Sequence, residues 1–148
     1  MVVYGLLDFT DVATAALQKI AAHVAKPRPQ YVSRKPDSPS WRRHLAGQAA
    51  VHLCLRKVTA VGSIEYGDPT TGFSMRLSGA GPWKYLSISH TKSVAVVALG
   101  SVPVGIDVEE CDRDVRKVLG RVCAEGVGYG FSWEFESDFR QVADTATL

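Results

Sequence analysis

The stretch Leu86–Glu109 constrains the fold more than any other part of this sequence. Three apolar runs with the length and composition of β-strands lie in or beside it: Tyr85–Ser89, Val94–Leu99 and Val104–Val108. The second and third runs flank Gly100-Ser101-Val102-Pro103, a turn-forming sequence that predicts an antiparallel hairpin. Such a hairpin would bring the end of the third run back beside the end of the first.

Two carboxylates, Asp107 and Glu109, close this stretch one residue apart. Side chains at positions i and i+2 of a strand share a face, and the hairpin would carry both carboxylates toward Ser89 and His90. Paired carboxylates with room for water suit a hard cation such as Mg2+. The spacing alone favours a solvated strand end, because carboxylates are mostly exposed.

An amphipathic helix is predicted over about residues 11–25, with Thr10 as its N-cap. Its apolar face comprises Val12, Ala16, Leu17, Ile20, Ala21 and Val24. His23 falls within this helix, and we assign it a structural role.

A second helix is predicted from Ser38-Pro39, an N-cap serine followed by proline at the first helical position, to about Val58. Arg42 and Arg43 lie in its first turns. Cations there oppose the helix dipole and often meet an anion, although a surface arginine pair is the simpler interpretation.

The remaining elements complete an α+β fold. Further strands are predicted at Met1–Leu7, Ser63–Tyr66 and Phe73–Leu77, and further helices at 112–125 and 131–142. Together they predict a mainly antiparallel sheet packed against two or three helices, in a single domain spanning residues 1–148.

Composition narrows the classes of function. A net charge of +2 gives no reason to expect nucleic-acid binding, and no run approaches the roughly 18 apolar residues of a membrane span. The beginning of the chain lacks the pattern of a signal peptide, so we expect a cytoplasmic protein without a membrane partner. The three cysteines, which predict neither a disulfide framework nor a zinc site, are Cys54, Cys111 and Cys123. We interpret them as small core residues or free thiols.

Four short motifs occur in order between Ser38 and Glu109 and resemble those of the 4'-phosphopantetheinyl transferase superfamily. They are Arg43-His44-Leu45-Ala46-Gly47, Tyr66-Gly67-Asp68-Pro69, Ile88-Ser89-His90-Thr91 and Val104-Gly105-Ile106-Asp107-Val108-Glu109. The family counterparts are an Arg-x-Leu-x-Gly helix, a Tyr-Gly-Lys-Pro turn, Ile-Ser-His-Ser and Ile-Gly-Ile-Asp-Ile-Glu. Each motif is weak alone, but their order and spacing resemble the first lobe of the surfactin-synthetase type.

The resemblance implies a reaction and a set of site residues. Such enzymes transfer 4'-phosphopantetheine from coenzyme A to a serine of an acyl or peptidyl carrier protein in natural product biosynthesis. They require Mg2+ and release adenosine 3',5'-bisphosphate. By resemblance, Asp107 and Glu109 bind the metal, while Arg43, Ser89 and His90 contact coenzyme A, with His90 also counted among the catalytic residues. Metal ions, cations and positioning are what phosphoryl transfer chiefly needs from a protein.

Two departures from the family pattern affect the same site. The lysine of the family's turn is replaced by Asp68, which places a repelling charge near phosphate. The family's Trp-x-x-Lys-Glu helix corresponds to Trp133-Glu134-Phe135-Glu136-Ser137, in which the lysine is absent and Glu136 comes one position early. One position on a helix rotates a side chain by about 100°. By resemblance, the base that accepts the carrier serine's proton is Glu136, or water if Glu136 does not reach the serine.

The length of the chain suggests an assembly. By resemblance, residues 1–110 correspond to a first lobe and residues 111–148 to a remnant or divergent second lobe. A lone lobe would leave half a cleft, so we expect a homo-oligomer or a partner chain that completes it. The alternative is a family member without transferase activity that binds carrier proteins or acts as a partner subunit.

Overall fold

A computed structural model describes residues 1–25, 38–67 and 75–110 of the chain. The chain divides into two compact units, Met1–Val108 and Glu109–Thr147, and the description below concerns the first. Several predicted features lie outside the described residues: the helices at 112–125 and 131–142, Asp68, Cys111, Cys123 and Glu136.

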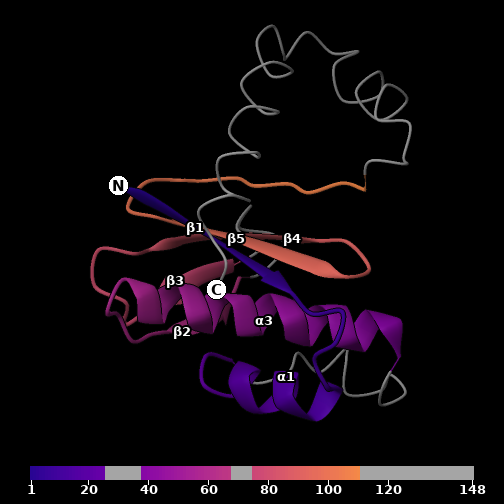
Figure 1. Ribbon diagram of the computed structural model, residues 1–148. Helices are drawn as coiled ribbons and strands as arrows, with labels where there is room; N and C mark the ends of the chain where they lie inside the picture. Colours follow the sequence, from indigo (N-terminus) through magenta and orange to yellow (C-terminus); the bar gives the residue numbers. More distant parts are fainter. Residues whose placement is uncertain (26–37, 68–74, 111–148) are drawn as a thin grey trace, which may run out of the picture. The chain divides into compact units, whose positions relative to one another are not determined.

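The first unit is built on a five-stranded antiparallel sheet in the order β1-β5-β4-β3-β2 (Figure 1). The strands are β1 (Val2–Asp8), β2 (Ser63–Tyr66), β3 (Met75–Ser78), β4 (Tyr85–His90) and β5 (Val94–Gly100). Among the described strands, the first in sequence therefore pairs with the last, with Val2 opposite Gly100 and Asp8 opposite Val94. The predicted antiparallel sheet with two helices is confirmed for the described part of the chain.

The longer helix, α3 (Pro39–Lys57), begins where the sequence predicts. The Ser38 hydroxyl accepts a hydrogen bond from the Trp41 backbone N–H, with a donor–acceptor distance of 3.2 Å. Pro39 fills the first helical position, where its missing N–H has no intrahelical partner to lose. The cap and the proline together fix the start of α3.

The shorter helix, α1 (Thr14–Ala21), corrects the prediction of a helix over residues 11–25 with Thr10 as N-cap. Thr10 instead donates both its backbone N–H and its hydroxyl to the Asp8 carboxylate. These bonds lower the pKa of Asp8 and hold the chain in a turn, so α1 starts later, after Ala13, which provides no side-chain cap. The predicted apolar face is confirmed, since Leu17, Ala21 and Val24 are buried.

His23 therefore lies beyond the end of α1 and not within it. Its ring stacks on that of His52 in α3, with 4.6 Å between ring centroids and 17° between ring planes. Close by, the Ile64 N–H of β2 donates to the Val24 carbonyl and ties this part of the chain to the sheet.

The principal core lies between α3 and one face of the sheet, and α1 packs against α3 (Figure 1). Its fully buried members include Leu17, Leu45, Leu55, Val97 and Leu99. Gly47 brings α3 close to the sheet, because a Cβ at this position would lie 3.0 Å from Cγ2 of Ile88. The glycine of the Arg-x-Leu-x-Gly sequence thus has a packing role.

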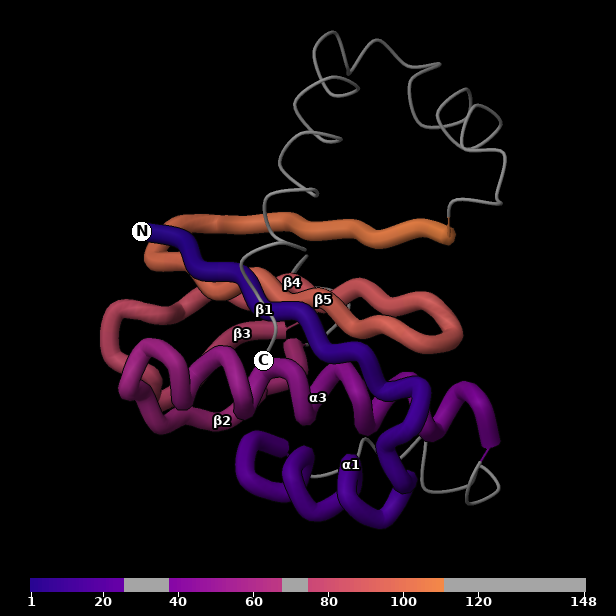
Figure 2. The backbone as a smooth tube through the Cα atoms, viewed as in Figure 1, coloured from indigo at the N-terminus to yellow at the C-terminus, as the bar shows by residue number. Residues whose placement is uncertain are grey.

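The opposite face of the sheet carries the chain that follows β5. The predicted hairpin strand at Val104–Val108 is wrong, since these residues form no backbone ladder with β5. They instead run along the sheet on the side opposite α3 (Figure 2). We call residues 104–108 the 104–108 segment.

Within the described ranges, no helix is both long enough and apolar enough to cross a membrane.

Candidate functional site

Two serines of β4 hold the 104–108 segment against the sheet. Ser87 Oγ accepts a hydrogen bond from the Ile106 N–H at 3.1 Å, and Ser89 Oγ accepts one from the Val108 N–H at 3.2 Å. Ser89 Oγ also donates to Oδ1 of Asp107 at 2.6 Å. Side-chain hydroxyls here take the role that backbone carbonyls have in a sheet ladder, which explains why no additional strand forms.

The path of the chain into this segment depends on Gly100. A Cβ on Gly100 would lie 2.6 Å from the Val102 carbonyl oxygen and 3.3 Å from Cγ1 of Val104. The chain can fold back over the sheet because position 100 has no side chain. The small residue Ala98 and the serines of β4 leave room on the same face, with Ser87 opposite Ala98 and Ser89 opposite Val96.

Exposure alternates along the segment as an extended chain requires. Asp107 is exposed and Val108 is buried, with 6% of its surface accessible. The predicted division between a carboxylate on the outer side and an apolar residue on the inner side is therefore confirmed at these two positions. The predicted proximity to Ser89 is confirmed as well, although it arises from side-chain bonds and not from a hairpin. Glu109 is half-buried and begins the second unit.

His90 lies exposed at the end of β4, beside the turn to β5. The Thr91 hydroxyl accepts from the Val94 N–H at 3.1 Å and from the Ser93 N–H at 3.3 Å, so Thr91 builds that turn. His90 is therefore an exposed residue at the end of β4, next to Ser89 and to a turn that is closed by hydrogen bonds.

Arg43 reaches the same end of the sheet from the other face. Gly47 of α3 lies under Ile88, and Arg43 precedes Gly47 by one helical turn on the same side of the helix. Helix α3 runs in the direction opposite to β4, so this turn lies toward the His90 end of the strand (Figure 1). Arg43 is half-buried. A helix, a strand end and the 104–108 segment thus direct Arg43, His90 and Asp107 to one end of the sheet.

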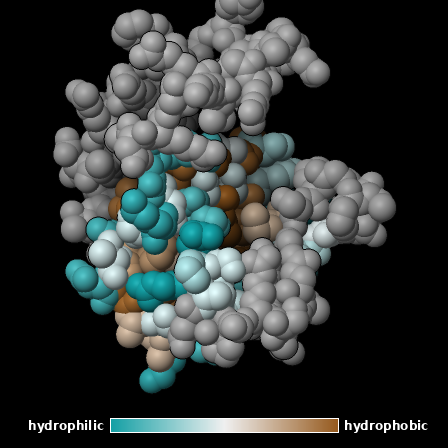
Figure 3. All heavy atoms as spheres, turned by 90° about the vertical axis from the view of Figure 1, so that its right-hand side faces the viewer, coloured by the Kyte–Doolittle hydropathy of each residue, from teal (hydrophilic) through white to brown (hydrophobic). Residues whose placement is uncertain are grey.

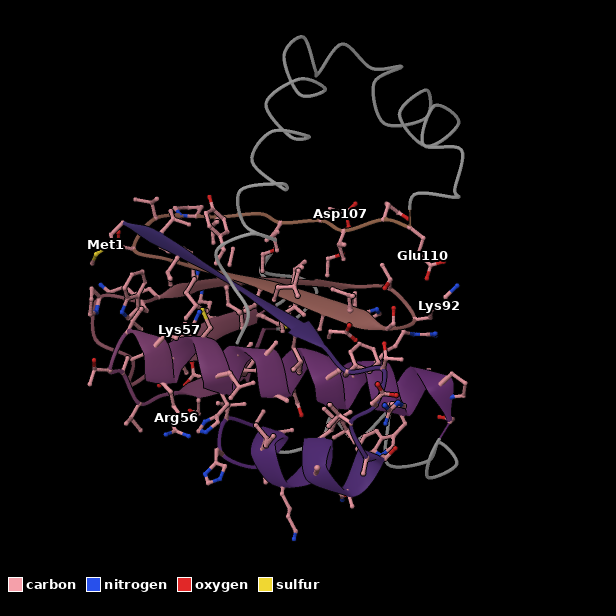
Figure 4. The ribbon with its side chains drawn as sticks, in the orientation of Figure 1. Met1, Arg56, Lys57, Lys92, Asp107 and Glu110 are labelled. Atoms are coloured by element: carbon pink, nitrogen blue, oxygen red, sulfur yellow. The ribbon has the colours of Figure 1, made fainter. Side chains whose placement is uncertain are left out.

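Hydrophilic residues predominate at this end. Figure 3 faces it and shows them gathered on the described surface beside a smaller hydrophobic area. In Figure 4, Asp107 lies on the 104–108 segment, and Lys92 lies in the turn between β4 and β5. The combination of exposed cationic and anionic groups is compatible with a phosphate-bearing ligand and a cation.

Arg42, the neighbour of Arg43, has a different role. Its guanidinium donates to the Phe9 carbonyl and to the Thr14 hydroxyl, and it lies over the Phe9 ring at 5.5 Å from the centroid. Arg42 therefore fastens the connection between β1 and α1 to the start of α3. Of the arginine pair, Arg43 is the residue that can serve a ligand.

Buried polar and thiol groups elsewhere belong to the core. Gln48 is 2% exposed, and its Nε2 donates to the Tyr66 hydroxyl at 2.6 Å. Cys54 is buried, and burial raises the pKa of its thiol to about 11. A thiol that is protonated at neutral pH is a poor nucleophile, which supports the interpretation of Cys54 as a core residue.

Asp107 contributes one carboxylate of the kind that hard cations bind. It offers carboxylate oxygen in an exposed position, and Mg2+ binds through one or two carboxylates while it keeps several waters. The described residues contain no group of three or more His, Cys, Asp or Glu side chains placed to hold a metal ion. Of the predicted site residues, Ser89 and Asp107 are joined by a hydrogen bond and His90 follows Ser89 on β4, whereas Arg43 lies on α3, on the opposite side of the sheet from Asp107.

Sequence reasoning missed Ser87 as a partner of the segment. A signal for it is present, because Leu86-Ser87-Ile88-Ser89 alternates apolar and small polar residues. Such alternation places the two serine hydroxyls on one face of the strand. Small polar side chains do not form an apolar core, so this face is suited to hydrogen bonds with another segment.

Comparison of the chain with protein-family models, with curated proteins and with solved structures found no match.

Proposed function

We propose that this protein transfers 4'-phosphopantetheine from coenzyme A to a serine of an acyl or peptidyl carrier protein. The observation that supports this most is the 2.6 Å hydrogen bond from Ser89 Oγ to Asp107 Oδ1. It joins two of the motifs that resemble the phosphopantetheinyl transferases, across 18 positions of the sequence. A chance likeness of separate motifs gives no reason for them to meet.

Each residue has a role in this proposal. Asp107 and Glu109 would hold Mg2+, which would supply charge neutralisation of the phosphates. Arg43 and His90 bind and orient the phosphates of coenzyme A, with Ser89 beside them. Glu136 or water removes the proton of the carrier serine, whose oxygen forms a bond to the phosphorus that carries the pantetheine arm. The bond from that phosphorus to the bridging oxygen breaks, and adenosine 3',5'-bisphosphate leaves.

The test is the mass of an apo carrier protein after incubation with coenzyme A, Mg2+ and the purified chain. We expect the carrier to gain the mass of one phosphopantetheine group, and the Asp107→Ala variant to give no gain. Glu65→Ala, which removes an exposed carboxylate from β2 at the far edge of the sheet, is the matched control and retains transfer. Absence of transfer to several different carriers at high protein concentration contradicts the proposal.

A second candidate function is carrier-protein binding without transfer. Asp68 in place of the family's turn lysine and the lysine absent from the Trp133 motif favour it, since both changes remove groups that bind phosphate in the family. Calorimetry separates the two candidates. Coenzyme A binding that requires Mg2+ supports the transferase, whereas a complex with a carrier protein and no such binding supports the second candidate.

Both candidates include an assembly, either of several copies of the chain or with a partner chain. Size-exclusion chromatography with light scattering measures it directly. If the chain forms a homo-oligomer, the purified protein has a mass above that of one 16.0 kDa chain. A monomer that transfers efficiently would overturn the assembly and leave the transferase proposal intact.

A further inference from the structure

The Ser89 hydroxyl makes two hydrogen bonds to the 104–108 segment. It donates to Oδ1 of Asp107 at 2.6 Å and accepts from the Val108 N–H at 3.2 Å. Both the carboxylate and the peptide that follows it are therefore fixed by one group. A hydroxyl has one hydrogen to donate, and here that hydrogen is committed to Asp107.

We propose that Ser89 is a positioning residue that holds the Asp107 carboxylate in one orientation. This inference rests on the proposed function, in which Asp107 binds a cation. The bond uses one lone pair of Oδ1, and an ionised carboxylate has about four acceptor sites. Oxygen sites for a cation and its waters remain on Asp107 after Ser89 is bound.

Holding an exposed carboxylate matters because its side chain is otherwise free to rotate. Asp107 is exposed, so packing does not restrict its χ1 angle. A cation site built on a rotating carboxylate must order it on binding, and that ordering weakens the affinity. Hydrogen bonds that orient a metal ligand in advance typically change metal affinity by about 10- to 100-fold.

Ser87 supplies a matched control for this role. It lies two residues earlier on the same face of β4, and its hydroxyl also accepts a backbone N–H of the 104–108 segment, that of Ile106. No bond from Ser87 to Asp107 is seen. Loss of either serine removes one attachment of the segment, but only loss of Ser89 releases the carboxylate.

The experiment measures the rotamer of Asp107 by NMR, from the couplings between its Hα and Hβ protons. The wild-type chain and the Ser87→Ala variant are expected to show couplings of a single χ1 rotamer. Ser89→Ala is expected to show averaged couplings, and Ser89→Thr, which keeps the hydroxyl, to restore the single rotamer. If either alanine variant detached the whole 104–108 segment from the sheet, the Asp107 couplings would be averaged in both variants. That result would overturn a specific role for Ser89. Averaging in the wild type, or a fixed rotamer in Ser89→Ala, would overturn the proposal too.

A Mg2+ titration followed by calorimetry adds the functional readout. We expect Ser89→Ala to weaken Mg2+ binding by about tenfold or more, with Ser87→Ala close to wild type and Ser89→Thr restored. Equal affinities in Ser89→Ala and wild type would contradict the positioning role. Absence of Mg2+ binding in the wild type would count against the transferase proposal, while the rotamer measurement would still decide whether Ser89 orients Asp107.

Discussion

At the scale of single residues, the stacked pair His23 and His52 has the clearest physical consequence. Desolvation by burial lowers the pKa of His52 below 6.5, and the nearby His23 and Arg56 lower it further. His23 comes from the turn that follows α1, whereas His52 and Arg56 lie one turn apart on α3. Protonation therefore places an additional positive charge between two basic neighbours, at the junction of the two helices.

The sign of the pH effect follows from this direction. The unfolded chain binds a proton at His52 more readily than the folded chain does, so the contribution of this residue to stability is complete above about pH 6.5. It is lost as the pH falls through the lowered pKa of the folded state. We predict that the urea midpoint of unfolding decreases between pH 7.5 and 5.5, and that His52→Gln makes this decrease smaller.

The His23→Gln variant is the companion measurement, because it removes one of the causes that lower the pKa of His52. Its pH dependence should lie between those of the wild type and His52→Gln. Asp8, whose pKa is lowered from 3.8 by its bonds to Thr10, stays ionised throughout this pH range and does not contribute. An unchanged pH dependence in His52→Gln would show that other groups cause it.

At the scale of elements, the contact between α3 and β4 depends on a glycine in the middle of a helix. Glycine there costs about 1 kcal/mol relative to alanine, so an alanine would be favoured if space allowed it. Space is limited, since a Cβ at position 47 would lie 3.0 Å from Cγ2 of Ile88. The close approach of helix and sheet is obtained at the expense of helix propensity.

A double-mutant cycle tests this trade. We predict that Gly47→Ala stabilises the chain by about 0.5–1 kcal/mol in an Ile88→Ala background, where the intrinsic preference for alanine is free to act. In the wild-type background the contact with Ile88 should remove that gain or reverse it. Urea unfolding of the four proteins gives the coupling, and the same effect of Gly47→Ala in both backgrounds would show that the contact is unimportant.

The elements also show how far the sequence predicts the fold. Ser63–Tyr66 and the start of α3 at Ser38-Pro39 were predicted correctly, because alternation and capping are local signals. The start of α1 was wrong because Asp8 and Thr10 satisfy each other, a choice that either residue alone does not reveal. The 104–108 segment looked like a strand because its composition suits extended chain in either setting. Whether its N–H groups meet a backbone or two serines depends on tertiary structure.

The candidate site was predictable to a similar extent. Motif order predicts Ser89, His90, Asp107 and Arg43 as one set, and of these the fold joins Ser89 to Asp107 by a hydrogen bond. The separate roles of Arg42 and Arg43 were not predictable, since both occupy the first turns of α3. Only the contacts of Arg42 with Phe9 and Thr14 distinguish them.

At the scale of the whole first unit, Gly100 connects the sheet to the segment that crosses it. Residue 100 pairs with Val2 on one side and Tyr85 on the other, and it also begins the turn into the 104–108 segment. A side chain at this position would meet the Val102 carbonyl oxygen at 2.6 Å, which is closer than nonbonded atoms approach. Backbone must move to relieve that contact, because no flexible side chain can yield.

We predict that Gly100→Ala destabilises the chain by about 1–3 kcal/mol, the usual effect of forcing additional atoms into a packed region. Gly105→Ala is the matched control, because nothing lies within 4 Å of a Cβ there. Its effect should stay within about 0.5 kcal/mol. Urea unfolding measures both, and a Gly100→Ala variant as stable as the control would show that the turn accommodates a side chain.

The pairing of β1 with β5 has a consequence for biosynthesis. On the ribosome, Val2–Asp8 emerges well before its partner Val94–Gly100, which follows α1, α3, β2, β3 and β4 in the sequence. Helices α1 and α3 can form from local contacts before β5 is synthesised, whereas β1 cannot pair until β5 has left the exit tunnel. An apolar strand is thus exposed for most of the time the first unit is being made, and this interval is when chaperones have access to it.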